Sequence, residues 1–298
     1  MSAPIELIGV DWGGTNLRAY ALGPDGVLLD QRESSAGVRT LGPDAFAGAL
    51  ADILKGWPRA PVLMCGMIGA RQGWVEAPYC ITPVSAGELA RAFTQVAPGV
   101  QIVCGVAQRA EGLLHDVMRG EETQVFGAVE EDSSARLVCP GTHSKWVEVE
   151  SGRIVALRTY LTGELFALLR EHSMLGVPRH NSAFNPAPFT EGLARGLEDR
   201  ALSAAIFSTR VAMLDDRMRA DETGDYLSGL LIGAEFAGAA PKGDIHIIAS
   251  PTLAERYAHA LRHIGARPHI VSPDRAVPRG LWRIWSNANH DSRARAPG

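Results

Sequence analysis

The fold is decided by the stretch Ile5-Glu6-Leu7-Ile8-Gly9-Val10-Asp11-Trp12-Gly13-Gly14-Thr15-Asn16 and by the residues 17–22 that follow it. The apolar run over residues 5–10 predicts a buried strand, and residues 17–22 predict a second one. A glycine turn with an acid at its start joins the two strands, and a turn at residues 24–26 leads into a third. A Rossmann domain would instead pass from its first strand into a helix.

A second series of the same kind begins near residue 135. The predicted strand 135–139 ends in Pro140-Gly141-Thr142-His143-Ser144-Lys145, and strands are predicted again at 145–149 and 153–159. This weak duplication favours two similar α/β domains, for which 298 residues suffice. We place the boundary near residue 132, which gives domains 1–132 and 133–298, and the last helix could pack back on the first domain.

Helices and further strands fill the remaining sequence. The Ser85/Glu88 capping box marks the start of one helix. Amphipathic spacing and breakers predict helices at 44–57, 85–96, 122–130, 163–172, 193–214, 225–237 and 253–264, and strands at 61–65, 101–106 and 244–249.

Composition excludes several classes of protein. A net charge of −4 argues against a nucleic-acid binder with a broad basic surface. No segment approaches the roughly 20 apolar residues that span a bilayer. The 4 cysteines are widely spaced in apolar surroundings, which favours buried free thiols over disulfides or metal ligation. The expected location is therefore the cytoplasm.

The two glycine turns suit phosphate binding, because a residue without Cβ lets main-chain N–H groups approach phosphate oxygens. Neither turn matches the P-loop, and no dinucleotide signature follows a strand. The predicted phosphate contacts are Gly13, Gly14, Thr15, Asn16, Gly141 and Thr142.

Five blocks then identify a resemblance. They are residues 66–74 (GMIGARQGW), 116–124 (DVMRGEETQ), 141–146 (GTHSKW), 162–166 (TGELF) and 227–235 (LSGLLIGAE). In this order they resemble the 2-dehydro-3-deoxygalactonokinase family, and the two turns resemble the phosphate motifs of the actin and hexokinase superfamily. The likeness covers residues 5 to about 265.

The resemblance implies a two-domain actin-like ATPase (ribonuclease H-like) fold. Duplicated mixed sheets would be flanked by helices, with the site in the interdomain cleft. It implies ATP and Mg²⁺ as cofactors and phosphorylation of the 6-hydroxyl of 2-dehydro-3-deoxy-D-galactonate. Closure of the two domains over the sugar acid would keep water out.

Catalytic roles fall on four acids. Asp11, at a strand end, can hold Mg²⁺ through water, although an acid capping the turn would look the same. The resemblance places the general base before the helix that leads into the second turn, where Asp116, Glu121 and Glu122 are candidates, and the separation from Gly141 that is usual in the superfamily favours the last two. Glu122 could equally be a favourable first-turn acid of its helix.

Substrate contacts are predicted at Arg71 and Arg119, because arginine grips carboxylates with two prongs. A structural salt bridge would explain either arginine as well. Lys145 and His143 follow the second phosphate turn, where Lys145 could contact phosphate or the sugar acid and His143 is more simply a structural hydrogen-bonding residue. Glu164, in the block 162–166, is a further predicted substrate contact.

The resemblance also implies an adenosine motif with Gly229 and Gly233, although an amphipathic core helix shares much of that pattern. Relatives of this fold usually carry a glycine pair after the later strand, where this chain has Ala249-Ser250-Pro251. The nucleotide preference is therefore open.

Alternative functions either keep the fold and the kinase activity with another substrate, or belong to another class of protein. The substrate could be another 2-keto-3-deoxy sugar acid or an amino sugar, or the chain could be a non-catalytic, nucleotide-dependent sugar sensor. A polymer-forming actin relative is disfavoured because the large insertions are missing. A homodimer is expected only because symmetric dimers predominate among soluble oligomers.

Overall fold

The computed structural model describes residues 3–178, 183–199 and 201–294. They form two compact units. Unit 1 contains the chain up to Ser134, the segment Val147–Leu157 and the chain from Pro273 onward, and unit 2 contains Ala135–Trp146 and Arg158–Ser272. The division into contiguous domains at residue 132 and the placing of the site between domains stay predictions.

The main sheet of unit 1 has the strand order β3-β2-β1-β4-β8-β7. Its strands are β1 (Leu7–Trp12), β2 (Leu17–Leu22), β3 (Leu28–Ser34), β4 (Val62–Gly66), β7 (Thr94–Ala97) and β8 (Val100–Ile102). β1 and β2 are antiparallel, with Asp11 opposite Arg18, and β1 and β4 are parallel, with Asp11 opposite Cys65. The predicted opening meander is confirmed, and it leaves Asp11 at the end of a central strand.

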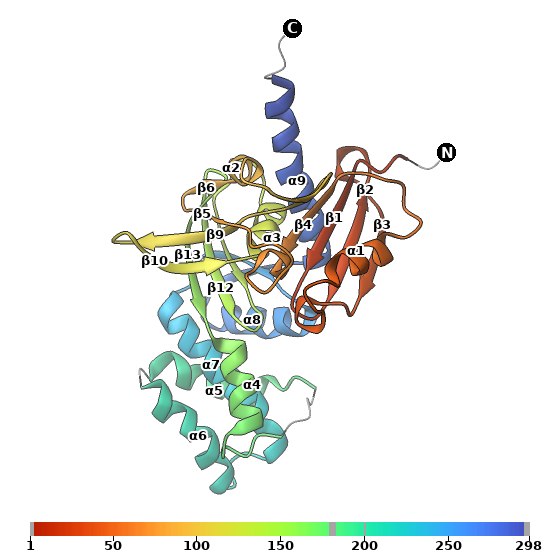
Figure 1. Ribbon diagram of the computed structural model, residues 1–298. Helices are drawn as coiled ribbons and strands as arrows, with labels where there is room; N and C mark the ends of the chain where they lie inside the picture. The colour runs from red at the N-terminus through yellow and green to blue at the C-terminus, as the bar shows by residue number, and fades with distance from the viewer. Residues whose placement is uncertain (1–2, 179–182, 200, 295–298) are drawn as a thin grey trace. The chain divides into compact units, whose positions relative to one another are not determined.

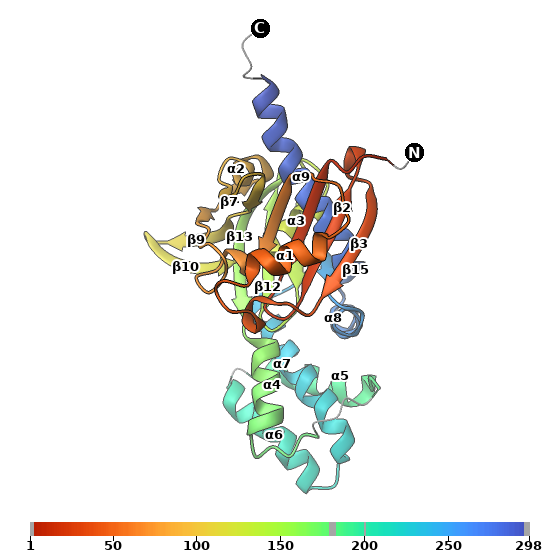
Figure 2. The same ribbon diagram turned by 45° about the vertical axis from the view of Figure 1, so that its right-hand side comes forward.

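Side chains of β1 alternate between two helical layers. Ile8, Val10 and Trp12 share a buried apolar cluster with Phe46 of α1 (Phe46–Leu54). On the opposite face, a Cβ atom at Gly9 would lie 2.8 Å from a methyl carbon of Leu281 in α9 (Pro273–Ala294). Figure 2 shows α1 in front of this sheet and α9 behind it. The period of 2 thus buries both faces of β1.

A small sheet and two helices complete unit 1. The sheet has the order β10-β9-β5. Its strands are β5 (Tyr79–Ile81), β9 (Gly105–Ala110) and β10 (Leu113–Met118), and the helices are α2 (Ala86–Ala90) and α3 (Glu121–Ala128). The helix α3 packs tightly on α9, where a Cβ atom at Gly280 would lie 1.9 Å from the carbonyl oxygen of Thr123.

The third sheet has the order β15-β14-β11-β12-β13-β6. Its strands are β6 (Val84–Ser85), β11 (Ala135–Cys139), β12 (Ser144–Glu150), β13 (Arg153–Tyr160), β14 (Asp244–Ile248) and β15 (Arg267–Val271). The residues of β12 and β13 are divided between the units. The order β13-β12-β11-β14-β15 repeats β3-β2-β1-β4-β8, including the parallel pairs that β4 and β14 make. The predicted duplication is therefore confirmed.

Helices make up most of the rest of unit 2. They are α4 (Thr162–His172), α5 (Pro186–Glu198), α6 (Leu202–Leu214), α7 (Thr223–Ala239) and α8 (Pro251–His263). In Figure 1, α5 and α7 lie side by side. Phe189 of α5, Phe236 of α7 and Tyr257 of α8 are buried in one apolar cluster with strand residues of the third sheet.

Two predicted helices are wrong in extent. The capping box at Ser85 is confirmed, but α2 ends at Ala90 and residues 94–97 form β7. The predicted helix 193–214 is interrupted after Glu198, where the side chain of Asp199 accepts a hydrogen bond (2.8 Å) from the backbone N–H of Ala201. Such a local side-chain bond competes with helix continuation.

The cysteines and the membrane prediction can be compared directly with the structure. None of the four cysteines, all of which lie in the described residues, forms a disulfide, and Cys80 keeps more exposed surface than the buried Cys65, Cys104 and Cys139. Among the described residues, none of the helices combines the length and apolar character needed to cross a bilayer.

Candidate active site

The first glycine turn is clamped by the segment that follows β3. The N–H of Gly13 donates to the carbonyl oxygen of Asn16 (2.9 Å), which closes the turn. The N–H groups of Val38 and Arg39 donate to the carbonyl oxygens of Gly13 (3.0 Å) and Gly14 (2.9 Å). The carbonyl groups are thereby held on one side, and the turn has the fixed backbone that anion binding requires.

Arg39 was not singled out from the sequence. A Cβ atom at Gly14 would lie 3.1 Å from Nε of Arg39, so this exposed guanidinium lies directly against the turn. An arginine beside a glycine turn suits phosphate. The sequence held no signal for it, because β3 lies between the turn and Arg39 and only folding brings them together.

Asp11 lies in a group of charges supplied by separate elements. Burial raises the pKa of Asp11 to about 6, Arg18 opposes this rise, and the carboxylates of Glu121 and Asp274 add to it. Glu121 begins α3, and Asp274 is in the first turn of α9. A carboxylate whose charge is disfavoured by burial and by other carboxylates would gain from a nearby cation.

These oxygen donors fit Mg²⁺, which prefers carboxylates and keeps several waters or phosphate oxygens as ligands. In the part of the chain that the structure describes, no three His, Cys, Asp or Glu side chains are grouped so that they could hold a metal ion by themselves. Asp11 therefore suits an ion that is bound jointly with a substrate.

Glu121 and Glu122 begin α3 directly after Gly120, whose backbone has a φ of 106°. Glu122 is buried and accepts a hydrogen bond (2.7 Å) from the N–H of Gly120, while Glu121 accepts one (3.1 Å) from the N–H of Arg119. Burial, with a smaller contribution from Glu121, raises the pKa of Glu122 to about 8. A Cβ atom at Gly120 would lie 3.1 Å from Cα of Gly66, so these acids stand beside the end of β4.

Asp116, the third candidate base, lies on a different element. It is in β10, and its carboxylate accepts a hydrogen bond (2.7 Å) from the N–H of Val117. Glu121 and not Asp116 contributes to the charge environment of Asp11. The charges of Glu121 and Asp11 therefore influence each other, and Asp116 stays a candidate base on β10.

The loop that follows β4 carries one predicted substrate arginine and packs against the other. Arg71 is exposed. Arg119 donates from Nη2 to the carbonyl oxygen of Ala77 (2.7 Å), and its guanidinium carbon is 4.3 Å from the ring centre of Tyr79. A Cβ atom at Gly69 would lie 3.0 Å from Nη1 of Arg119. Arg71 is thus part of the glycine loop, and Arg119 packs against this loop from the segment before α3.

The second glycine turn is held by the start of α4. The N–H of Glu164 donates to the carbonyl oxygen of Thr142 (2.8 Å), and a Cβ atom at Gly163 would lie 2.1 Å from the carbonyl oxygen of Gly141. The side chains of His143 and Glu164 are 2.7 Å apart, and both are partly exposed. The predicted residues Gly141, Thr142, His143 and Glu164 therefore form one local structure.

Lys145 lies on the strand that leaves this turn. It is buried, and its Nζ donates to Oγ1 of Thr159 (3.0 Å) on β13. A buried ammonium group needs nearby acceptors, and Thr159 provides one of them. Its predicted contact with substrate stays a prediction.

A pocket of about 580 Å³ opens beside the second turn, within unit 2. Its walls combine the turn, the starts of α4 and α8, one side of α7 and two arginines. They are formed by Pro140, Gly141, Thr162, Gly163, Phe166, Arg170, Ala183, Phe184, Ser228, Leu231, Ile232, Thr252, Leu253, Glu255, Arg256 and Tyr257. Apolar walls that end at a glycine turn suit a ligand with a flat apolar part and an anionic part.

Gly229 and Gly233, predicted to contact adenosine, face α5. A Cβ atom at Gly229 would lie 2.0 Å from the carbonyl oxygen of Phe189, and one at Gly233 would lie 2.3 Å from that of Leu193. Neither glycine lines the pocket, whereas Ser228 of the same helix does. Their direct role in nucleotide binding stays a prediction, and the contact that the structure provides is helix packing.

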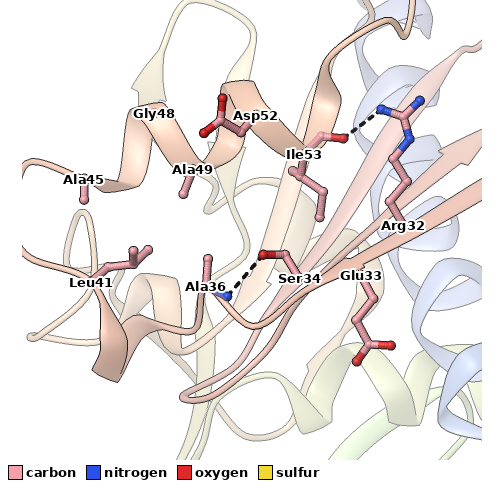
Figure 3. A pocket seen from close by; sticks show the side chains of 10 residues that line it. All are labelled: Arg32, Glu33, Ser34, Ala36, Leu41, Ala45, Gly48, Ala49, Asp52 and Ile53. Carbon is pink, nitrogen blue, oxygen red and sulfur yellow. Dashed lines mark hydrogen bonds between the residues drawn. The ribbon is translucent and has the colours of Figure 1, made fainter.

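Unit 1 has a larger hollow of about 880 Å³ between the end of β3 and α1 (Figure 3). Its polar groups are engaged in holding the fold. Arg32 donates to the carbonyl oxygens of Ile53 (2.9 Å) and Lys55 (2.7 Å), and Ser34 accepts from the N–H of Ala36 (3.2 Å). We therefore place the candidate chemistry at the two glycine turns and not here.

Comparison with known proteins adds an independent line of evidence. A family model described as 2-keto-3-deoxy-galactonokinase matches residues 11–284. The chain is 38% identical over 286 residues to the 2-dehydro-3-deoxygalactonokinase of Escherichia coli K12, covering 93% of this chain and 96% of that protein.

Solved structures agree on the fold. A crystal structure from Sinorhizobium meliloti, provisionally named as a 2-dehydro-3-deoxygalactonokinase, has a TM-score of 0.84 and 35% identity over 93% of this chain and 97% of that one. The activator of 2-hydroxyisocaproyl-CoA dehydratase from Clostridium difficile, solved with ADPNP, has a TM-score of 0.53 and 10% identity over 98% of each chain, which is a likeness of fold alone. The actin-like α/β fold expected from the sequence is confirmed.

Proposed function

The chain belongs to the 2-keto-3-deoxy-galactonokinase family and is a carbohydrate kinase, and we propose that it transfers the γ-phosphoryl group of ATP to the 6-hydroxyl of 2-dehydro-3-deoxy-D-galactonate. The observation that carries this proposal is the repeated arrangement of a glycine turn at a strand end. One turn follows β1 beside Asp11, and the other follows β11 beside the pocket of unit 2. Phosphoryl transfer depends on holding and neutralising phosphates, which is what such turns do.

The nucleotide is proposed to bind in the pocket of unit 2. Its flat base would lie between apolar walls such as Phe166 and Leu253, and its phosphates would approach Gly141. Arg170 and Arg256 are cationic groups at the same pocket. Arg39 is a further proposed phosphate contact at the first turn.

Asp11 is proposed to hold Mg²⁺, supported by its oxygen donors and by neighbouring carboxylates that raise its pKa. When bound, the ion would neutralise charge on the phosphates. Asp11 itself must be ionised for this role, and with a pKa of about 6 it is mostly ionised at neutral pH.

Glu121 is our proposed general base. It is only partly buried, so a substrate hydroxyl can reach it, and it shares the charge environment of Asp11. Glu122 is less suited, because it is fully buried and its raised pKa of about 8 favours the protonated form at neutral pH. Glu121 would accept the hydroxyl proton as the oxygen attacks phosphorus.

The carboxylate of the sugar acid is proposed to bind at the glycine loop of unit 1. Arg71 is exposed on this loop, and Arg119, from the segment between β10 and α3, packs against Gly69 of the loop. A guanidinium group matches the planar, bidentate geometry of a carboxylate. His143 and Glu164 are kept as proposed contacts with the sugar acid, and Lys145 as a proposed contact with phosphate or the sugar acid.

Two broader proposals rest on the sequence. The dispersed cysteines favour a reducing cytoplasm, and the homodimer remains the default for a metabolic enzyme. Nothing in the charge balance calls for a nucleic-acid partner.

The test is ADP release with MgATP against 2-dehydro-3-deoxygalactonate, 2-dehydro-3-deoxygluconate, glucose, N-acetylglucosamine and glycerol. Turnover confined to the galactonate is the expected result. Preference for another sugar acid would replace the substrate and keep the kinase. ATP binding without turnover on any acceptor would favour the sensor reading.

A further inference from the structure

Glu235, near the end of α7, is a buried carboxylate whose four neighbours all donate to it. It is 2% exposed. Oε1 accepts hydrogen bonds from Oγ of Ser144 (2.8 Å) and Nε1 of Trp146 (2.7 Å). Oε2 accepts from the hydroxyl of Tyr257 (2.8 Å) and from Oγ1 of Thr162.

These four donors belong to the elements that build the nucleotide pocket. Ser144 is the residue at which the second glycine turn enters β12, and Trp146 follows it on that strand. Thr162 opens α4 directly before Gly163, and both residues line the pocket. Tyr257 of α8 also lines it. One carboxylate thus ties together the turn and the starts or faces of two pocket helices.

The place of Glu235 in this arrangement is specific. The carbonyl oxygen of Gly141 lies so close to Gly163 that no Cβ atom fits between them. Glu235 accepts hydrogen bonds from Ser144, which follows Gly141 at the end of the turn, and from Thr162, which directly precedes Gly163. It therefore holds both of the segments that touch. Burial raises the pKa of the Glu235 carboxyl, and its four donors oppose that rise.

We propose that Glu235 is a positioning residue for the nucleotide: from beneath the pocket it fixes the second glycine turn against α4 and α8, without contacting ATP. This inference rests on the proposed ATP site and extends it to a residue outside the pocket wall. It predicts that ATP affinity depends on the carboxylate, whereas affinity for the sugar acid does not.

Glutamine is the informative substitution, because it keeps the size of Glu235 but has one acceptor oxygen and a donating NH₂ group. The indole N–H of Trp146 can only donate, so the amide oxygen has to stay on that side. The NH₂ group then faces Thr162 and Tyr257, whose hydroxyl groups can turn round and accept. The fold should therefore survive, while the side facing the pocket is rearranged.

The experiment compares wild type, Glu235→Gln and the control Glu150→Gln. Glu150 is an exposed acid at the far end of the same strand as Ser144. Binding of ATP is measured by calorimetry without acceptor, alongside kcat and both KM values. We expect Glu235→Gln to weaken ATP binding about tenfold, the change that follows from loss of one charge-assisted hydrogen bond. The KM for the sugar acid should stay within about twofold, and Glu150→Gln should match wild type.

A second variant, Ser144→Ala, keeps the proposal open to refutation if Glu235→Gln fails to fold. Ser144 is fully buried, and its replacement by alanine removes one of the four donors to Glu235 together with the acceptor of a hydrogen bond (3.2 Å) from the Tyr257 hydroxyl. Ser144→Ala should also weaken ATP binding, and the double variant should lose less binding free energy than the sum of the two single losses. Unchanged ATP affinity in a folded Glu235→Gln or Ser144→Ala protein, or equal loss for both substrates, would overturn the positioning role. Failure of wild type to bind ATP would instead refute the proposed function.

Discussion

A Cβ atom at Gly163 would lie 2.1 Å from the carbonyl oxygen of Gly141, so the backbone of α4 touches the second glycine turn directly. Gly163→Ala should force the two apart, with overpacking that costs about 1–3 kcal/mol. We expect the KM for ATP to rise about tenfold or more, measured with saturating sugar acid. The matched control is Gly48→Ala on α1, where a Cβ atom meets nothing within 4 Å. Equal kinetics for the two variants would show that this contact does not shape the site.

Asp11→Asn should make the protein more stable at pH 8 and abolish its activity. The pKa of Asp11 is raised from its usual 3.8 to about 6, so the native state holds the proton more tightly than the unfolded state. The unfolding free energy contributed by this group therefore falls as pH rises from about 4 to 6 and stays low above that. Asparagine removes the charge, so the variant without ligands should be more stable at pH 8 by an amount on the order of 2 kcal/mol.

The same substitution should abolish turnover, because an amide is a poor Mg²⁺ ligand. Urea unfolding at pH 4 and pH 8 measures the stability, and ADP release measures the activity. Substantial turnover by Asp11→Asn would exclude the metal-holding role.

Glu121→Gln and Glu122→Gln should have opposite kinetic outcomes. Loss of the general base at Glu121 should lower kcat by about 10²–10⁴ with little change in either KM. Glu122 is mostly protonated at neutral pH, so its amide analogue should keep kcat within a few fold. Asp116→Asn on β10 should resemble wild type. A larger loss in Glu122→Gln than in Glu121→Gln would reverse the assignment of the base.

Substitutions of the exposed arginines Arg71 and Arg39 should impair the use of different substrates. Arg71→Ala should raise the KM for the sugar acid by about 10- to 100-fold, because a charged hydrogen bond is lost, and leave the KM for ATP unchanged. Arg39→Ala, beside Gly14, should act on ATP or on kcat instead. Each variant is the control for the other. If both raise the same KM, the proposed separation of carboxylate and phosphate contacts is wrong.

Gly229→Ala should reduce stability through the α5–α7 contact. Its Cβ atom would lie 2.0 Å from the carbonyl oxygen of Phe189, so the helices must separate, at a cost of about 1–3 kcal/mol. Gly224→Ala, on the same helix, has its nearest neighbour at 3.8 Å and should be neutral or slightly stabilising. Urea titration of both variants makes the comparison. Equal stability would show that the close approach is not required.

Short sequence patterns correctly predicted those strands and helix starts that are determined by residues close together in the chain. The apolar run over residues 5–10 and the capping box at Ser85 were sufficient for β1 and for the start of α2. They could not locate the end of α2, because β7 exists only through its pairing with β8, in which Thr94 lies opposite Ile102. The turn at Gly99, with a φ of 75°, was the signal for that hairpin.

The same limit applies to the candidate site. Turns next to strands were predictable, since their residues are contiguous and their chemistry is evident. Arg39 and Glu235 were not predicted, because their partners lie on other elements. The packing of the α7 glycines against α5 was not predicted either, although Gly192 and Gly196 repeat the spacing of Gly229 and Gly233.

That pair of helices bears on how nucleotide preference could evolve in this family. One side of α7 lies backbone to backbone against α5, and Ser228, Leu231 and Ile232 of the same helix form a wall of the pocket. A larger residue at Gly229 or Gly233 would collide with α5 and displace α7 together with this wall of the pocket. Mutation can therefore hardly change the position of the wall. In family members that accept another purine or phosphate donor, we expect the changes in the pocket residues of α4 and α8. We expect natural variation in nucleotide choice to be concentrated around Phe166 and Leu253.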